Sequence, residues 1–157
     1  MRKFLSALLA ALVLAPAAWA GSTASHTVTV TAAAINEVSI TGGNVSLTIN
    51  SATAGSGPAS VSDSTTADLN WSTNEATKKI TVATSLATVR FPLTVAAASV
   101  SGGTGAGTVT LSTTAQDFVT GISTTDGTCG LSYEASATSA AGTGTDTHTV
   151  TYTITAG

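Results

Sequence analysis

Apolar and polar residues alternate along most of the chain after residue 20. In residues 147–155, Val150, Tyr152 and Ile154 share one parity, and threonines fill most of the other. Residues 26–31 repeat this pattern with Val28 and Val30 between threonines. Because successive side chains of a strand point to opposite faces, both segments are predicted to be amphipathic β-strands.

The same two-residue period recurs between these segments, and glycine-rich or polar stretches separate the runs. We expect further strands over residues 35–40, 45–49, 67–72, 78–84, 89–95, 109–111 and 129–138, and a short strand or bulge over residues 117–122. Residues 67–72 and 78–84 are predicted to form a hairpin, as are residues 131–138 and 147–155. About eight or nine short strands and no helical period after residue 20 predict an all-β fold, an antiparallel β-sandwich of immunoglobulin-like or jelly-roll topology.

The inward parity of these strands defines an expected core, in which Trp71 is the largest anchor. Cys129 is the only cysteine, so no disulfide within the chain is expected, and its parity points it inward with its neighbours. The residues predicted to pack between the two sheets are Trp71, Phe91, Cys129, Leu131, Tyr133, Tyr152 and Ile154.

The first 20 residues have the three regions of a secretory signal peptide. Arg2 and Lys3 precede an apolar run over residues 4–14, and residues 18–20 read Ala-Trp-Ala, a cleavage site. The run is shorter than the roughly 18 residues that a membrane span needs. We therefore expect residues 1–20 to be a cleaved signal helix, residues 21–157 to form a single sandwich domain, and the protein to be secreted or held at a bacterial cell surface.

Charge is scarce in this chain, at 8% of residues, while threonine fills about one position in five. Residues 21–157 carry three basic and eight acidic side chains, a net charge of −5 with neutral histidines. Without a basic patch, nucleic acid is not an expected partner. Threonine hydroxyls hydrate the outer face of a strand without charged side chains. A neighbouring surface could therefore cover this face at little desolvation cost, which favours self-association.

Candidate chemistry is sparse, and we expect no catalytic residue, cofactor or metal. Asp146, His148 and a serine could be drawn as a hydrolase triad, but the Gly-x-Ser-x-Gly elbow is absent. Several aspartates lie in or beside turns and could meet at a calcium ion, although no Asp-x-Asp-x-Asp spacing occurs. The alternative for those aspartates is turn formation.

Three stretches, with the Ala-x-Ala signal and the Thr-Val repeats, carry a resemblance to known proteins: residues 69–75, 78–82 and 146–155. Together they look like small secreted bacterial β-sandwich surface proteins. More loosely, the chain is similar to subunits of extracellular fibres that assemble by donor-strand complementation and to surface domains of the WxL kind. Trp71 is followed by Ser72 and Thr73, so the Trp-x-Leu signature of that last group is missing.

These observations favour a structural subunit of an extracellular fibre, pilus-like filament or surface matrix that associates into a homopolymer. His26, Val28 and Val30 mark the expected assembly strand, which a neighbouring copy could accept along an open sheet edge. Pairing of this strand within its own sandwich is the competing expectation. The alternative function is a monomeric secreted module that adheres to a cell surface or binds cell-wall carbohydrate.

Overall fold

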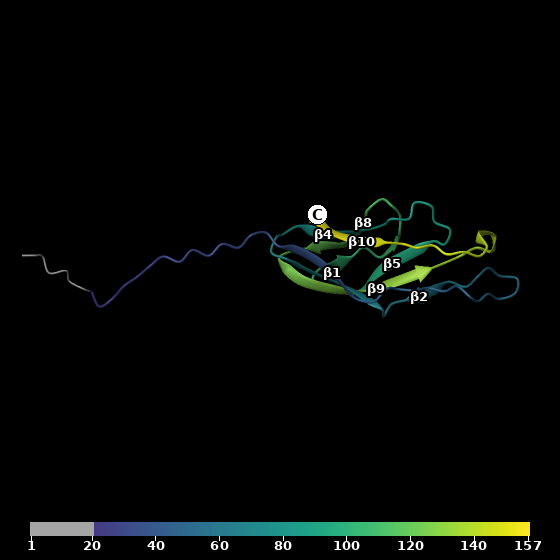
Figure 1. Ribbon diagram of the computed structural model, residues 1–157, viewed down its shortest axis with the longest axis horizontal. Helices are drawn as coiled ribbons and strands as arrows, with labels where there is room; N and C mark the ends of the chain where they lie inside the picture. The colour runs from purple at the N-terminus through teal and green to yellow at the C-terminus, as the bar shows by residue number, and fades with distance from the viewer. Residues whose placement is uncertain (1–20) are drawn as a thin grey trace, which may run out of the picture. The chain divides into compact units, whose positions relative to one another are not determined.

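The computed structural model describes residues 21–157 (Figure 1). The expected signal peptide lies outside these residues. The chain divides into two units between Ala32 and Ala33, and all ten strands of the described residues belong to the second unit. Those strands form two antiparallel sheets, which confirms the predicted all-β sandwich.

The larger sheet has six strands in the order β1-β3-β9-β5-β7, with β2 pairing on β9. Its strands are β1 (Asn36–Gly42), β2 (Val61–Asp63), β3 (Ala67–Thr73), β5 (Leu93–Ser101), β7 (Thr108–Thr110) and β9 (Thr125–Ala135). Strand β9 is the longest, and it pairs with β3 on one side and with β5 on the other. It is therefore the centre of the sheet.

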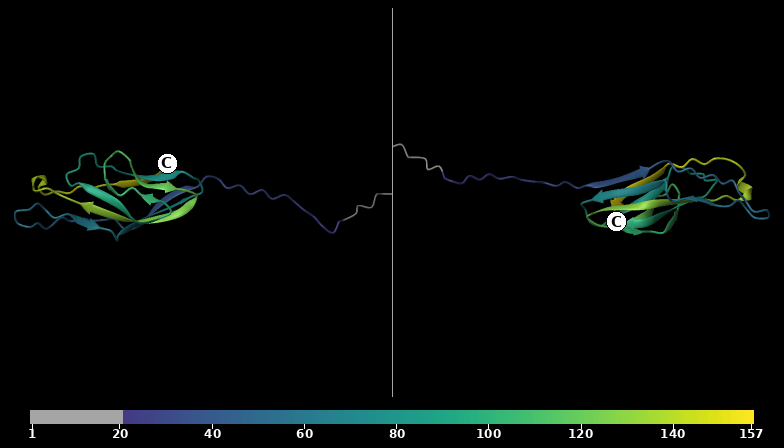
Figure 2. Two further views of the ribbon diagram at one scale, coloured as in Figure 1. Left: turned by 180° about the vertical axis from the view of Figure 1, so that it is seen from behind. Right: turned by 90° about the horizontal axis from the view of Figure 1, so that it is seen from below.

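The smaller sheet has four strands in the order β10-β4-β8-β6. They are β4 (Lys78–Thr84), β6 (Thr104–Gly105), β8 (Gln116–Ile122) and β10 (Val150–Ala156), and a short 3-10 turn, η1 (Ser139–Ala141), precedes β10. Strands β1 and β10 each end the order of their own sheet, and they lie side by side in the right-hand view of Figure 2. This side of the sandwich therefore joins the edges of both sheets.

Both sheets turn their apolar parity toward a shared core, as the alternation predicts. The fully buried side chains are Leu69, Ile80, Val82, Val95, Phe118, Val119, Ile122, Cys129 and Leu131. The Phe118 and Tyr152 rings pack with centroids 5.1 Å apart, and both belong to the smaller sheet. The Tyr133 and Tyr152 hydroxyls, 2.9 Å apart, form a hydrogen bond from one sheet to the other across this core.

Both predicted hairpins are wrong in their pairing. β3 and β4 are joined by a short turn, and β9 and β10 by the longer connection of residues 136–149, yet in both cases the two strands belong to different sheets. Each pair is an arch that crosses the core. In each pair, the apolar faces of the two strands therefore point toward each other across the core. The hydrogen bond between the Tyr133 and Tyr152 hydroxyls is an example. Alternation reveals which face of a strand is buried, but the same pattern suits a ladder and an arch equally.

Two predicted strands are absent from the described residues. Residues 26–31 and residues 45–49 alternate as expected, but neither segment joins a sheet. Strand β5 also begins later than predicted, at Leu93, because Pro92 has no amide hydrogen to donate to a ladder. Phe91 thus lies just before the strand, and it is only partly buried instead of belonging to the closed core.

The outer faces are mostly neutral. Two ion pairs occur in the described part of the chain, Lys78 with Glu75 and Lys79 with Asp117, each at 2.9 Å and partly exposed. Threonine and serine occupy much of the remaining surface. None of the helices in residues 21–157 is long and apolar enough to cross a membrane.

Candidate functional site: a groove between unpaired chain segments

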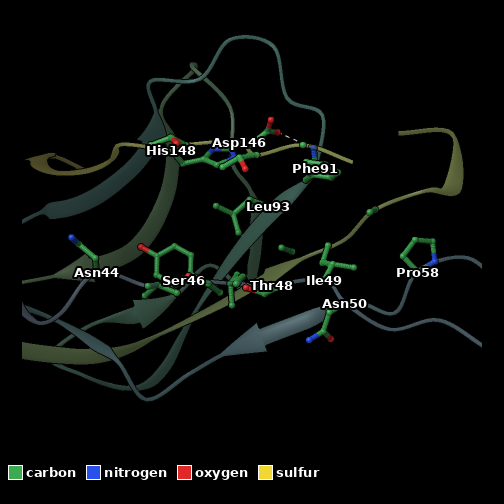
Figure 3. Close-up of a pocket in the computed structure, with 18 of the residues that line it drawn as sticks. Asn44, Ser46, Thr48, Ile49, Asn50, Pro58, Phe91, Leu93, Asp146 and His148 are labelled. Carbon is green, nitrogen blue, oxygen red and sulfur yellow. Dashed lines mark hydrogen bonds between the residues drawn. The ribbon is translucent and has the colours of Figure 1, made fainter. Parts of the chain in front are cut away.

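A groove of about 1230 Å³ opens on the side where the edges of the two sheets meet. Two extended segments line it, residues 43–50 following β1 and residues 143–149 preceding β10. Figure 3 shows Asn44, Ser46 and Thr48 along one side, and Asp146 and His148 along the other, with Leu93 between them. The groove is therefore a slot with one wall from each sheet.

The first wall exists because the chain leaves its sheet at Gly42. Gly42 is the last residue of β1 in register with β3, opposite Ala67, and its φ is 99°. A Cβ at this position would collide with the Thr66 carbonyl oxygen, so only glycine fits without strain. The Gly43 amide then donates to that same carbonyl at 3.2 Å. Beyond this turn, residues 44–50 make no backbone hydrogen bond to any described strand.

Alternation continues along this wall. Val45, Leu47 and Ile49 are half-buried and line the groove, while the polar residues between them are exposed. Val45 and Leu47 also pack against the core. Residues 43–50 therefore have the side-chain arrangement of a strand, but their backbone edge lacks a partner.

Hydrogen bonds at both ends hold the second wall, residues 143–149, in place. The Asp146 carboxylate accepts hydrogen bonds from the Arg90 and Phe91 amides at 2.7 and 2.8 Å. The Arg90 guanidinium donates to the Thr143 carbonyl at 2.8 Å. At the other end, His148 Nδ1 lies 3.1 Å from Thr84 Oγ1. These bonds fix residues 143–149, while the backbone of residues 144–148 makes no hydrogen bond to a strand in the described residues.

Asp146 therefore has a structural role in this wall. The hydrogen bond from the Phe91 amide, with a smaller contribution from the Arg90 amide, lowers the pKa of Asp146, so it stays ionised at neutral pH. No hydrogen bond joins Asp146 to His148, whose ring contacts Thr84. The arrangement does not form the hydrolase triad that the sequence allowed. In residues 21–157, no cluster of three His, Cys, Asp or Glu side chains could hold a metal.

The floor of the groove is apolar. Leu93 and Leu131 line it, together with Tyr133, Ala135 and the partly exposed Phe91. Leu131 and Tyr133 also belong to the buried core, so the groove opens directly onto the core between the sheets. An apolar floor between two unpaired backbone edges suits an extended peptide better than a small polar ligand.

The predicted site residues fall into two groups. Trp71, Cys129, Tyr133 and Tyr152 are buried. Val28 and Val30, the centre of the expected assembly strand, are 71% and 90% exposed, and His26 is exposed as well. The wall formed by residues 143–149 was not foreseen. Residues 142–146 have the composition of a turn, and residues 147–149 were predicted to begin the last strand, which instead begins at Val150. Only the hydrogen bonds to Arg90 and Phe91 show that this wall is held.

The pair of tyrosine hydroxyls makes the sandwich sensitive to high pH. Burial raises the pKa of Tyr133 above its ordinary 10.0, and burial followed by the nearby Tyr133 raises the pKa of Tyr152. Burial also raises the pKa of the Cys129 thiol from 9.0 to about 11. At a pH between the ordinary pKa of each group and its raised pKa in the fold, the folded protein retains a proton that the unfolded chain releases. The free energy of unfolding is therefore at its full value below about pH 9, and it falls as the pH rises through 10 and 11.

We expect the melting temperature to be constant from pH 7 to about pH 9 and to drop steeply by pH 11. Thermal unfolding followed by circular dichroism would measure this. A double variant, Tyr133→Phe with Tyr152→Phe, serves as the control, because its melting temperature should depend less on alkaline pH. An equal dependence in the control would show that these hydroxyls are not responsible.

Comparison with known proteins gives no relative: no family model, curated protein or solved structure matches the chain. The groove and residues 26–31 are therefore the features that bear on its function.

Proposed function

We propose that this protein is the structural subunit of an extracellular fibre or surface matrix, and that copies join when each donates residues 26–31 to a neighbour. The observation that carries the proposal is the exposure of Val28 and Val30, at 71% and 90%. These are the two most exposed large hydrophobic residues of the described chain. A strand that buried them would remove this exposed apolar surface from water.

The pattern of residues 26–31 supports a strand that pairs outside its own sandwich. Val28 and Val30 share one face and the threonines share the other, yet the ten strands of residues 33–157 leave this segment out. Each valine gains roughly 1.5–3 kcal/mol on full burial. Few charges occur on the surface, so contact between copies need not desolvate ions.

A chain that lacks residues 21–31 tests the proposal. The core residues all follow position 66 and the described ladders begin at Asn36, so the sandwich is expected to keep its fold after this deletion. We expect the wild-type chain to form filaments visible by negative-stain electron microscopy, and the shortened chain to remain monomeric. Circular dichroism would establish that the shortened chain is folded.

The opposite result would contradict the proposal. If the shortened chain forms normal filaments, residues 26–31 are not the joining element. If the wild-type chain stays monomeric and instead adheres to cell-wall material, the protein is an adhesive module.

A further inference from the structure

We propose that the groove between residues 43–50 and residues 143–149 is the acceptor site for residues 26–31 of a second copy of this chain. This inference rests on the proposed fibre function and adds to it the place where the donated strand binds. The occupant would lie between the two walls as an added strand, joining the edge of the larger sheet to that of the smaller one.

Unpaired backbone on both walls is the first argument. Buried or half-buried amide and carbonyl groups are normally paired. Residues 44–50 and residues 144–148 both lie extended beside an apolar floor without a partner strand in the described part of the chain. A single strand placed between them could form hydrogen bonds on both of its edges, whereas a small apolar molecule would leave both walls unpaired.

The direction of the two walls defines the geometry of this added strand. Figure 1 shows that the chain leaves β1 along residues 43–50 and returns toward β10 along residues 143–149. The walls thus run in opposite directions. A strand between them is antiparallel to one wall and parallel to the other, and it turns one face to the floor and the other to solvent.

The side chains of residues 26–31 match these two faces. With Val28 and Val30 directed at the floor, they meet an apolar surface formed by residues such as Phe91 and Leu93, which are partly exposed. The threonines then face solvent, where their hydroxyls stay hydrated. The donated strand carries no carboxylate or lysine, so no charge is buried.

A donor from another copy fits the whole groove, because the short link before Ile35 lets the same chain reach only the near end of its own groove. Asn74 fixes the start of the sandwich: its amide side chain donates to the Ala33 carbonyl at 2.7 Å and accepts from the Ile35 amide at 2.8 Å. From Ile35 to Gly43 is about 27 Å along the strand at 3.4 Å per residue. Val30 and Val28 can extend at most about 18 and 25 Å from Ile35. Within its own chain, neither valine therefore reaches the wall beyond Gly43, and Val30 reaches at most the near end of the groove at Ile40, about 17 Å from Ile35.

Two full-length variants test the acceptor site. The donor-defective chain has Val28→Asp and Val30→Asp, and its matched control has Thr27→Asp and Thr29→Asp on the opposite face. The acceptor-defective chain has Ala137→Trp. Ala137 is half-buried and lines the groove just after β9, so an indole there occupies the slot. Its control is Ser136→Trp, because Ser136 is the exposed neighbour of opposite parity.

We expect neither defective variant to form filaments alone, while both controls assemble as the wild type does. Mixed in equal amounts, the two defective variants should form one-to-one pairs, because one retains the donor and the other retains the groove. Size-exclusion chromatography with light scattering would show twice the monomer mass and no larger species. A fluorescent peptide of residues 25–32 should bind the donor-defective chain and lose at least tenfold in affinity when Ala137→Trp is added.

Each contrary outcome has a separate meaning. If the Ala137→Trp chain forms normal filaments while the donor-defective chain does not, strand donation stands and this groove is not the acceptor. If the donor-defective chain forms normal filaments, both the acceptor inference and the proposed route of assembly are wrong. If the mixed variants do not pair and the peptide does not bind, the inference is overturned even where the wild type forms fibres.

Discussion

Replacing Trp71 with alanine is expected to lower the free energy of unfolding by about 3–5 kcal/mol. Trp71 lies in β3 near the centre of the larger sheet and is 3% exposed. Its indole ring lies over Gly127 of the neighbouring strand β9, so closely that a Cβ on Gly127 would collide with the ring. Removal of the ring leaves a large cavity that the paired strands cannot close. Urea unfolding followed by circular dichroism would measure the loss.

Two further variants show whether the ring itself is responsible. The Trp71 indole N–H is buried without a hydrogen-bond partner, so Trp71→Phe removes an unpaired donor and should cost clearly less than the change to alanine. Gly127→Ala should destabilise the wild type by about 1–3 kcal/mol through overpacking, and much less in the Trp71→Ala background. A loss below about 1 kcal/mol for Trp71→Ala, or fully additive effects, would contradict this packing.

Replacing Gly42 with alanine should cost about 2–4 kcal/mol. The φ of 99° is strained for a residue with a side chain, and the added Cβ would meet the Thr66 carbonyl. To relieve both effects, the chain must move residues 43–50 away from their position beside the groove. We therefore expect the Gly42→Ala variant to lose assembly at temperatures where the wild type still forms filaments.

Gly43→Ala is the matched control for this change. A Cβ at Gly43 has only the Thr66 side chain near it, at 3.9 Å, and the backbone there is not in the left-handed region. Its loss of stability should stay within about 0.5 kcal/mol, as for an ordinary surface substitution. Equal melting temperatures for the two variants would show that the turn at Gly42 does not hold the first wall in place.

The alternation of residues was sufficient to predict the strands of the sandwich and most of its inward faces. Leu69 and Trp71, or Ile80 and Val82, are buried as their parity requires. The pairing of strands could not be predicted in this way. Hairpins were expected after β3 and β9, whereas both connections carry the chain across the core into the other sheet. Local pattern does not distinguish a neighbour in the ladder from a neighbour across the core.

The candidate site was predictable only in part. Val28 and Val30 stood out from the sequence, because their pattern is that of a strand and lies outside the clearest hairpins. The groove was not predictable. Residues 45–49 read as an ordinary strand, and only the three-dimensional arrangement shows that they pair with nothing. The φ of Gly42 and its contact with Thr66, which turn this segment out of the sheet, depend on a residue 24 positions away.

The scarcity of ion pairs on the sandwich determines how its stability responds to the concentration of salt. Dissolved salt screens exposed charges beyond about 10 Å at 0.1 M. The two ion pairs, Lys78 with Glu75 and Lys79 with Asp117, are partly exposed to solvent and contribute little to folding. Apolar burial and backbone pairing supply the rest, and screening leaves both unchanged. Screening of these two ion pairs by salt therefore lowers the stability of the fold only slightly.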